Sequence, residues 1–239
     1  MKKIEDLINN KKLYNKVIIQ QKLKSKKNTV AYVTIDNKPR VLKCFVPGLK
    51  GQMLNEYLIL KKGSSKLNIP FPYEIDKENN VLTLSYINGE NLCDLINDQK
   101  ILYDEKQRLI ILLANWFNDF HNFYKEDNKF KIRGDSSLRN FIFTDRIWGV
   151  DLEESREGKP EEDVADMCSS ILTTDPMFTK EKFNLCKIFI DEYINLSPGR
   201  IIKINDEIAY SLLKKIQWRP KDEDILRKYS KKIKSKGLK

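Results

Sequence analysis

The stretch KIRGDSSLRNFIFTDRIWGVDLEES, residues 131–155, places Asp135, Asn140, Asp151 and Glu153 among apolar residues. Asp135 and Asn140 are separated by four residues. Two short apolar runs, 141–143 and 147–150, follow with a polar turn between them, and this pattern predicts a hairpin. Asp151 comes directly after the second run. The order is therefore a carboxylate, an amide, a hairpin and a second carboxylate.

This order matches the chemical needs of phosphoryl transfer from ATP. The reaction requires a carboxylate that orients and deprotonates the acceptor hydroxyl, and oxygen ligands that hold magnesium against the phosphates. Protein kinases place the base Asp and a metal-binding Asn on one loop with this spacing. Asp135 is accordingly the candidate base, and Asn140 and Asp151 are candidate ligands for Mg or Mn. Asx residues also cap and turn loops, so a purely structural role for these residues stays open.

The remaining sequence predicts an α+β chain in which strands are followed by helices, with the change near Asn88-Gly89. Alternating or β-branched runs predict strands, and apolar residues at helical spacing predict helices. The predicted strands are 17–23, 30–35, 40–46, 72–76 and 81–87, the predicted helices are 50–62, 90–98 and 104–125, and the chain is mostly helical after 163. We expect a β-rich N-terminal lobe with one helix, residues 1–88, and a mostly helical C-terminal lobe with a basic tail, residues 89–239.

With these features the chain resembles the protein-kinase-like superfamily, and within it the compact KEOPS-complex kinase, RIO kinases and aminoglycoside phosphotransferases. The resemblance implies a bilobal fold and ATP as cofactor. Lys43 in VLKCF resembles the third-strand lysine that holds the ATP phosphates, and Glu56 resembles its ion-pair partner. By the same likeness, backbone groups of Ser85 and Ile87 would bind adenine. Asp166 in EDVADM resembles the buried aspartate that braces the catalytic loop.

Two local departures from that family pattern bear on the site. The segment LKSKKNT, residues 23–29, contains no glycine, although close backbone approach to phosphate normally uses glycine. Lys24, Lys26 or Lys27 could supply positive charge there instead. Arg133 stands where relatives have histidine, and the chain's only histidine, His121, is expected to pack or cap a helix.

A third departure concerns the segment after the second carboxylate. Asp166 comes only 15 positions after Asp151, which leaves no room for an activation segment. The sequence Asp-Leu-Glu at 151–153 is nearer to the Asp-aromatic-Glu of the phosphotransferases than to Asp-Phe-Gly. For Glu153, the sequence is equally consistent with a role near the metal and with a position on the surface.

The net charge of +10 is unevenly distributed. Residues 1–27 carry +7 and residues 219–239 carry +6, whereas the 191 residues between them carry −3. Basic ends on a nearly neutral body indicate a polyanionic partner such as nucleic acid, although solubilising lysines in a lysine-rich proteome would give the same pattern. Candidate substrate contacts are Arg139, beside Asn140, and Lys231 and Lys232 in the tail.

We therefore expect an ATP-dependent kinase acting on a hydroxyl of RNA, by family likeness the ribose 2′-hydroxyl of tRNA. An atypical serine/threonine protein kinase, a small-molecule phosphotransferase and a non-catalytic RNA-binding scaffold are the alternatives, and a protein partner is possible. The missing activation segment disfavours peptide substrates. No apolar run is long enough for a bilayer or a signal peptide, and the four cysteines show no paired spacing. A cytoplasmic protein without membrane attachment is the expectation.

Overall fold

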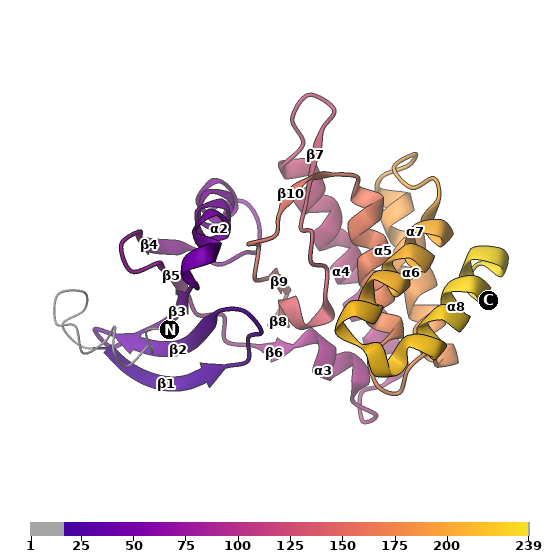
Figure 1. Cartoon of the computed structure of the whole chain (residues 1–239), viewed down its shortest axis with the longest axis horizontal. Helices are drawn as coiled ribbons and strands as arrows, with labels where there is room; N and C mark the ends of the chain where they lie inside the picture. Colours follow the sequence, from indigo (N-terminus) through magenta and orange to yellow (C-terminus); the bar gives the residue numbers. More distant parts are fainter. Residues whose placement is uncertain (1–16, 239) are drawn as a thin grey trace. The chain divides into compact units, whose positions relative to one another are not determined.

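The structure is a computed structural model that describes residues 17–238; residues 1–16, which belong to the basic N-terminal segment, and residue 239 lie outside the described residues (Figure 1). The chain divides into two compact units. The first unit comprises the described residues up to Asn88 together with Val150–Glu154. The second comprises Gly89–Gly149 and the chain from Ser155 onward.

An antiparallel five-stranded sheet forms the frame of the first unit, in the order β1-β2-β3-β5-β4. Its strands are β1 (Val17–Leu23), β2 (Thr29–Ile35), β3 (Lys38–Cys44), β4 (Pro72–Asp76) and β5 (Val81–Ser85). The turn between β2 and β3 consists of Asp36 and Asn37, whose φ angles are 49° and 62°. Asp and Asn tolerate this left-handed conformation, which a two-residue hairpin turn requires.

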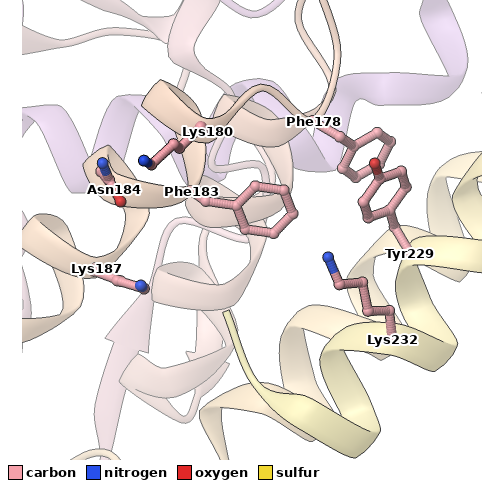
Figure 2. A pocket seen from close by; sticks show the side chains of 7 residues that line it. All are labelled: Phe178, Lys180, Phe183, Asn184, Lys187, Tyr229 and Lys232. Carbon is pink, nitrogen blue, oxygen red and sulfur yellow. The ribbon is translucent and has the colours of Figure 1, made fainter. Parts of the chain in front are cut away.

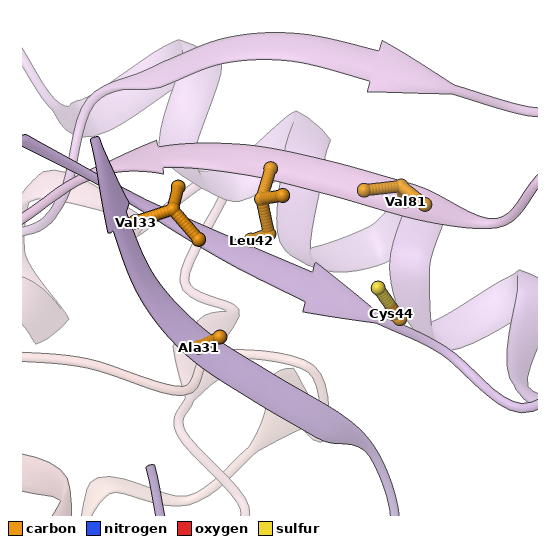
Figure 3. Packing of buried hydrophobic residues seen from close by; sticks show 5 residues of the cluster. All are labelled: Ala31, Val33, Leu42, Cys44 and Val81. Carbon is orange, nitrogen blue, oxygen red and sulfur yellow. The ribbon is translucent and has the colours of Figure 1, made fainter. Parts of the chain in front are cut away.

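Alternate residues of three strands form an apolar core on one face of this sheet (Figure 3). Ala31 and Val33 come from β2, Leu42 and Cys44 from β3, and Val81 from β5. Because side chains alternate across a strand, the residues between them face the opposite side. Lys43, between Leu42 and Cys44, therefore points away from this cluster.

Helix α2 (Lys50–Gly63) follows β3 in the first unit. Its buried residues are Met53, Glu56, Ile59, Leu60 and Gly63, at the spacing of one helix face. Glu56 is the charged member of that buried face. A carboxylate held away from water needs charged or hydrogen-bonding partners, so its position marks a polar site.

The second unit is built mainly from helices, drawn from magenta to yellow in Figure 1. These are α3 (Leu92–Asn97), α4 (Tyr103–Phe123), α5 (Pro160–Leu172), α6 (Lys180–Leu196), α7 (Ile204–Lys214) and α8 (Glu223–Lys236). Helix α4 buries Leu109, Leu113, Trp116 and Phe120 on one stripe and packs against α6. Burial of large apolar and aromatic side chains is the main stabilising contribution in such packing.

Short strands border the loop that contains Asp135. Strands β6 (Glu90–Asn91), β8 (Phe141–Phe143) and β9 (Ile147–Gly149) form one small sheet, and β7 (Phe130–Ile132) pairs with β10 (Arg156–Gly158). The sequence predicted the β8–β9 hairpin but not β6, β7 or β10, because two or three residues are too few to show a periodicity. The helix predicted over 90–98 begins at Leu92, since Glu90 and Asn91 pair with β8.

The predicted α+β class, with a sheet-rich first part and a helical second part, is confirmed by this architecture. Strand boundaries differ from the predictions by one or two residues, as in β3 and β5. Within residues 17–238, no helix combines the length and the apolar character needed to cross a membrane.

Candidate active site

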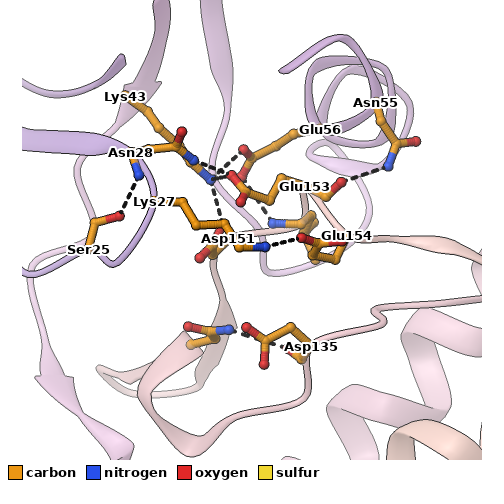
Figure 4. A network of polar contacts seen from close by, with 12 residues as sticks. Ser25, Lys27, Asn28, Lys43, Asn55, Glu56, Asp135, Asp151, Glu153 and Glu154 are labelled. Atoms are coloured by element: carbon orange, nitrogen blue, oxygen red, sulfur yellow. Dashed lines mark hydrogen bonds and ion pairs between the residues drawn. The ribbon is translucent and has the colours of Figure 1, made fainter. Parts of the chain in front are cut away.

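Lys43 lies near the end of β3 in the first unit, and its ammonium group is surrounded by carboxylates (Figure 4). Its Nζ atom lies 2.7 Å from Glu56 Oε2, 2.5 Å from Asp151 Oδ1 and 2.8 Å from Glu153 Oε2. The Lys43 side chain is only 6% exposed. The structure thus pairs Lys43 with Glu56, its expected ion-pair partner, and brings Asp151 to the same ammonium group.

The electrostatic balance keeps Lys43 charged. Burial lowers the pKa of Lys43, because a poorly solvated ammonium is disfavoured. The negative charges of Glu56, Asp151 and Glu153 oppose this effect and exceed it, so the pKa of Lys43 lies above its ordinary value. One cation among three carboxylates leaves an excess of negative charge, which favours the approach of a further cation.

The donor atoms of this cluster fit a divalent metal ion. Glu56, Asp151 and Glu153 each offer a carboxylate oxygen, and these oxygens lie within 4.8 Å of one another. Magnesium prefers oxygen ligands, and it is usually bound by one or two carboxylates together with substrate phosphates. The Asp151 side chain is 42% exposed, whereas those of Glu56 and Glu153 are buried. Asp151 is therefore the member that a metal–nucleotide complex could reach most easily.

The backbone at Asp151 has an uncommon conformation. Its φ angle is 62°, in the left-handed region that non-glycine residues seldom occupy. The next residue, Leu152, donates its backbone N–H to Glu56 Oε1 at 3.0 Å. This bond ties the turn to α2. Such conformations persist where the surrounding structure enforces them, often at functional positions.

The glycine-free loop between β1 and β2 is bonded to the segment 150–154. Asn28, which is 7% exposed, donates from Nδ2 to Glu153 Oε2 at 2.6 Å. Lys27 forms a 2.5 Å ion pair with Glu154. Ser25 Oγ accepts from the Asn28 backbone N–H at 3.3 Å. No pattern in the sequence pointed to Asn28, and the role of Glu153 was undecided. The structure makes Glu153 a buried partner of both Lys43 and the loop.

The two other lysines selected in this loop are exposed. Lys24 and Lys26 lie between the end of β1 and Asn28, and their side chains face solvent. Their predicted contact with a phosphate stays a prediction.

The predicted adenine-binding residues follow the sheet in sequence. Ser85 ends β5, and its backbone N–H donates to the Phe71 carbonyl at 2.9 Å. Of its two backbone groups, the carbonyl oxygen is thus the one available to the predicted contact. Ile87 lies two residues further on, outside regular secondary structure, and is half-buried.

The loop of the second unit contains Asp135, Arg139 and Asn140. Asp135 is exposed and follows Gly134, whose φ of 79° requires the conformational freedom of glycine. Asn140 ends a short 3-10 helix, Leu138–Asn140, and donates from Nδ2 to the Asp135 carbonyl at 3.3 Å. This orientation leaves the Asn140 Oδ1 atom as the oxygen suited to a metal. The Arg139 side chain is exposed.

The aspartate that braces this loop is Asp163, and the prediction of Asp166 was wrong. Asp163 is fully buried and accepts hydrogen bonds from the backbone N–H groups of Arg133 and Gly134, at 2.7 and 3.1 Å. Ser136 Oγ adds a third bond at 2.9 Å. Asp166 instead bonds Ser211 at 2.5 Å, elsewhere in the unit. Both lie in the sequence EEDVADM on α5, and three positions move a side chain by about 4.5 Å along the helix axis and about 60° around it.

His121 also supports this loop through Asp163. Its Nε2 atom lies 3.0 Å from Asp163 Oδ2, and its Nδ1 atom lies 2.8 Å from the Tyr193 hydroxyl. An ionised carboxylate only accepts hydrogen bonds, so Nε2 must carry a proton. The expected packing role of His121 agrees with its complete burial.

Arg133 is fully buried and stacks on aromatic rings. Its guanidinium carbon lies 4.6 Å from the centre of the Phe141 ring and 5.3 Å from that of Trp116. Arginine packs on aromatic faces through both dispersion and cation–π attraction. Arg133 therefore fills the space under the loop as a packing residue.

The basic tail belongs largely to α8. Lys231 and Lys232 are exposed on this helix, while Leu226, Ser230 and Ile233 are buried on its other face. The region is thus an amphipathic helix whose apolar face is packed, and not a loose extension.

Neither a family model nor a curated protein matches this sequence. Solved structures do match, and they define the class of fold: the chain has the protein-kinase-like fold shared by small phosphotransferases. The prediction of this superfamily is confirmed at the level of the fold.

Three of these structures show the extent of the likeness. The aminoglycoside phosphotransferase APH(4)-Ia matches with a TM-score of 0.69 and 11% identity, covering 98% of each chain. A point mutant of aminoglycoside 2′-phosphotransferase-IIIa, in complex with GDP, matches with a TM-score of 0.67 and 14% identity over 99% of this chain and 100% of the other. Choline kinase LicA from Streptococcus pneumoniae matches with a TM-score of 0.63 and 16% identity over 98% of each chain.

Proposed function

We propose that this protein is an ATP-dependent kinase that transfers the γ-phosphate of ATP to a hydroxyl group. The observation that carries the proposal is the buried Lys43 ammonium held between Glu56 and Asp151. Kinases use this Lys–Glu ion pair to hold nucleotide phosphates, and they use such an aspartate to bind magnesium. The fold supports the proposal, and the similar aminoglycoside 2′-phosphotransferase-IIIa was solved with GDP.

In this proposal the nucleotide is bound chiefly by the first unit. Lys43 neutralises phosphate oxygens, and Glu56 holds the Lys43 ammonium in place. Asp151 and Asn140 would be the ligands of Mg²⁺ or Mn²⁺, which would supply positive charge against that of the phosphates. The Ser85 carbonyl and the Ile87 N–H bond to adenine.

Asp135 is the proposed general base. It accepts the proton of the acceptor hydroxyl while that oxygen forms a bond to the γ-phosphorus. The bond between the γ-phosphorus and the β–γ bridging oxygen breaks, and ADP leaves with its electron pair. The exposure of Asp135 supports this role, because a base must be accessible to the acceptor.

RNA is the proposed acceptor, with the ribose 2′-hydroxyl of tRNA as the specific group. The support is electrostatic: the chain carries +10, and phosphate-backbone binding relies on Lys and Arg. Exposed Lys24, Lys26, Arg139, Lys231 and Lys232 are the proposed phosphate contacts. Lys27 is a further proposed contact: it forms an ion pair with Glu154, and an RNA phosphate would be its second anionic partner.

A small-molecule phosphotransferase is the second candidate. It is favoured by the likeness to aminoglycoside phosphotransferases and choline kinase, enzymes named for small cationic substrates. The strongly positive charge of this chain disfavours a cationic substrate by like-charge repulsion. An atypical serine/threonine kinase remains the third alternative.

The test is incubation of the protein with γ-labelled ATP and separate pools of total tRNA, protein extract and small metabolites. We expect label in the tRNA pool, and loss of that label by at least about a hundredfold in Asp135→Asn with ATP affinity nearly unchanged. The base acts on the acceptor and not on the nucleotide, which is why binding persists. Label in another pool would reassign the acceptor, and an active Asp135→Asn variant would exclude Asp135 as the base.

A further inference from the structure

Helices α6 and α8 of the second unit form a pocket that the proposed chemistry does not use (Figure 2). Its volume is about 300 Å³. It is lined by Phe178, Lys180, Phe183, Asn184, Lys187, Tyr229 and Lys232. In the view of Figure 2, Lys180, Asn184 and Lys187 lie on one side of the Phe183 ring, and Lys232 and Tyr229 lie on the other.

The charge of this pocket is strongly positive. Its lining contains three lysines and no carboxylate. Within the described part of the chain, none of the ammonium groups of Lys180, Lys187 and Lys232 has an acidic partner in an ion pair. Lys180 also lies in the first turn of α6, where the partial positive charge of the helix end adds to its own. The pocket therefore suits an anion with more than one negative group.

The aromatic rings give the pocket a flat apolar wall. Phe178 and Tyr229 stack with ring centres 3.9 Å apart and planes 5° apart. The Lys232 Nζ atom lies 5.6 Å from the centre of the Phe183 ring and 5.7 Å from that of Tyr229. Phe178 adopts a φ of 55°, which is unfavourable for a bulky residue and is held by its packing. Flat rings beside ammonium groups are the combination that binds bases together with their phosphates.

We propose that this pocket, the α6–α8 pocket, binds one nucleotide segment of single-stranded RNA, with phosphates on Lys180, Lys187 and Lys232 and a base or ribose against the rings. The proposal deepens the proposed function, since it rests on RNA as the acceptor and assigns a docking site outside the reacting groups. An acidic peptide would satisfy the lysines but would not use the rings. An anionic membrane would attract the lysines but would not stack against rings that line a pocket.

The experiment is a fluorescence anisotropy titration of a labelled single-stranded RNA across salt concentrations, without ATP. The pocket variant is Lys180→Gln/Lys187→Gln/Lys232→Gln. The charge-matched control is Lys228→Gln/Lys234→Gln/Lys236→Gln, in which three exposed lysines of α8 that do not line the pocket are changed. All six side chains are exposed, so both variants should fold, and their melting temperatures verify this.

We expect the pocket variant to lose affinity by about tenfold or more at low salt, with the slope of log K against log salt reduced by about two units. The control should keep most of the affinity and slope. Equal losses in the two variants would overturn the proposal, because they would show diffuse charge attraction. Competition by poly-glutamate or by anionic vesicles as effective as competition by unlabelled RNA would also overturn it.

The result is separable from the outcome of the labelling experiment. If RNA binds through the pocket but never becomes labelled, the docking site stands and the proposed function fails. If RNA becomes labelled and the pocket variant shows an unchanged KM for RNA, the proposed function stands and the docking site fails.

Discussion

At the scale of the residue, the buried carboxylate of Asp163 accepts hydrogen bonds from Arg133, Gly134 and Ser136 in the loop that contains Asp135. Burial raises the pKa of Asp163. The hydrogen bond and charge of His121, together with the hydrogen bond from the Arg133 N–H, lower the pKa by more than burial raises it, so the pKa lies below its ordinary value. The carboxylate organises the backbone on the N-terminal side of Asp135. Asp166, one helical turn away, is partly exposed and bonds Ser211 and Lys214.

The two aspartates should therefore respond differently to the same substitution. We expect Asp163→Ala to lower the free energy of unfolding by about 3–5 kcal/mol, because it leaves buried donors without an acceptor. Asp166→Ala should cost about 1 kcal/mol, since its contacts are partly solvated. Urea unfolding of both variants measures this. Equal losses would contradict the assignment of Asp163 as the bracing residue.

The pH dependence of the Asp163 effect has a definite sign. A carboxyl group whose folded pKa is depressed stabilises the fold above its unfolded pKa of about 3.9 and loses that contribution as the pH falls through the folded value. The stability difference between wild type and Asp163→Ala should consequently be constant near neutral pH and shrink in acid below about pH 4. A difference that grows with acidification would show that the carboxylate is not ionised in the fold.

At the scale of the element, α8 combines a basic face with a packed apolar face. Leu226 and Ile233 are completely buried, and the Ser230 hydroxyl donates to the Ala209 carbonyl at 2.9 Å. The helix also packs against α7. The exposed lysines of α8 can therefore be changed without disturbing the core. Removal of the whole helix would expose the apolar core that it covers.

Deletion and substitution of α8 should give different results. Removing residues 221–239 should lower the melting temperature strongly, because each buried leucine or isoleucine lost costs about 2–5 kcal/mol. Changing exposed Lys231 and Lys232 to glutamine should leave the melting temperature nearly unchanged while weakening RNA binding. Thermal unfolding followed by circular dichroism compares the two. A truncated chain as stable as the intact one would show that the packing of α8 contributes little.

At the scale of the whole molecule, the residues of the proposed reaction are divided between the two units. Asp151 belongs to the first unit, although it follows the β8–β9 hairpin of the second in sequence. Asn140 and Asp135 belong to the second. A reaction that needs all three therefore depends on both units being folded.

The two proposed metal ligands can be tested together. Asn140→Ala and Asp151→Ala should each raise the magnesium concentration that gives half-maximal activity, by about tenfold or more, because each removes an oxygen ligand. Nucleotide binding measured by fluorescence without metal should change little. Equal weakening with and without metal would contradict the assignment, and Asp145→Ala, an exposed carboxylate in the same hairpin, is the matched control.

The sequence alone predicted the class of fold and the positions of Lys43, Glu56, Asp135, Asn140 and Asp151. Asp135, Asn140 and Asp151 were selected from a spacing within one loop and the hairpin that follows it, which are local signals. Lys43 and Glu56 were assigned by the resemblance to kinases. The fold class is confirmed, and the structure places Lys43, Glu56 and Asp151 in contact. The roles of these residues remain proposals.

The tertiary structure decided which residues meet when their separation in sequence carries no signal. Asn28 bonds Glu153 across 125 positions, and Lys180 and Lys232 share a pocket from different helices. Asp163 rather than Asp166 lies under the loop because α5 packs with its first turn, which contains Asp163, against the backbone N–H groups of Arg133 and Gly134. Local propensity cannot specify such contacts, since they depend on how complete elements bury their apolar faces against one another.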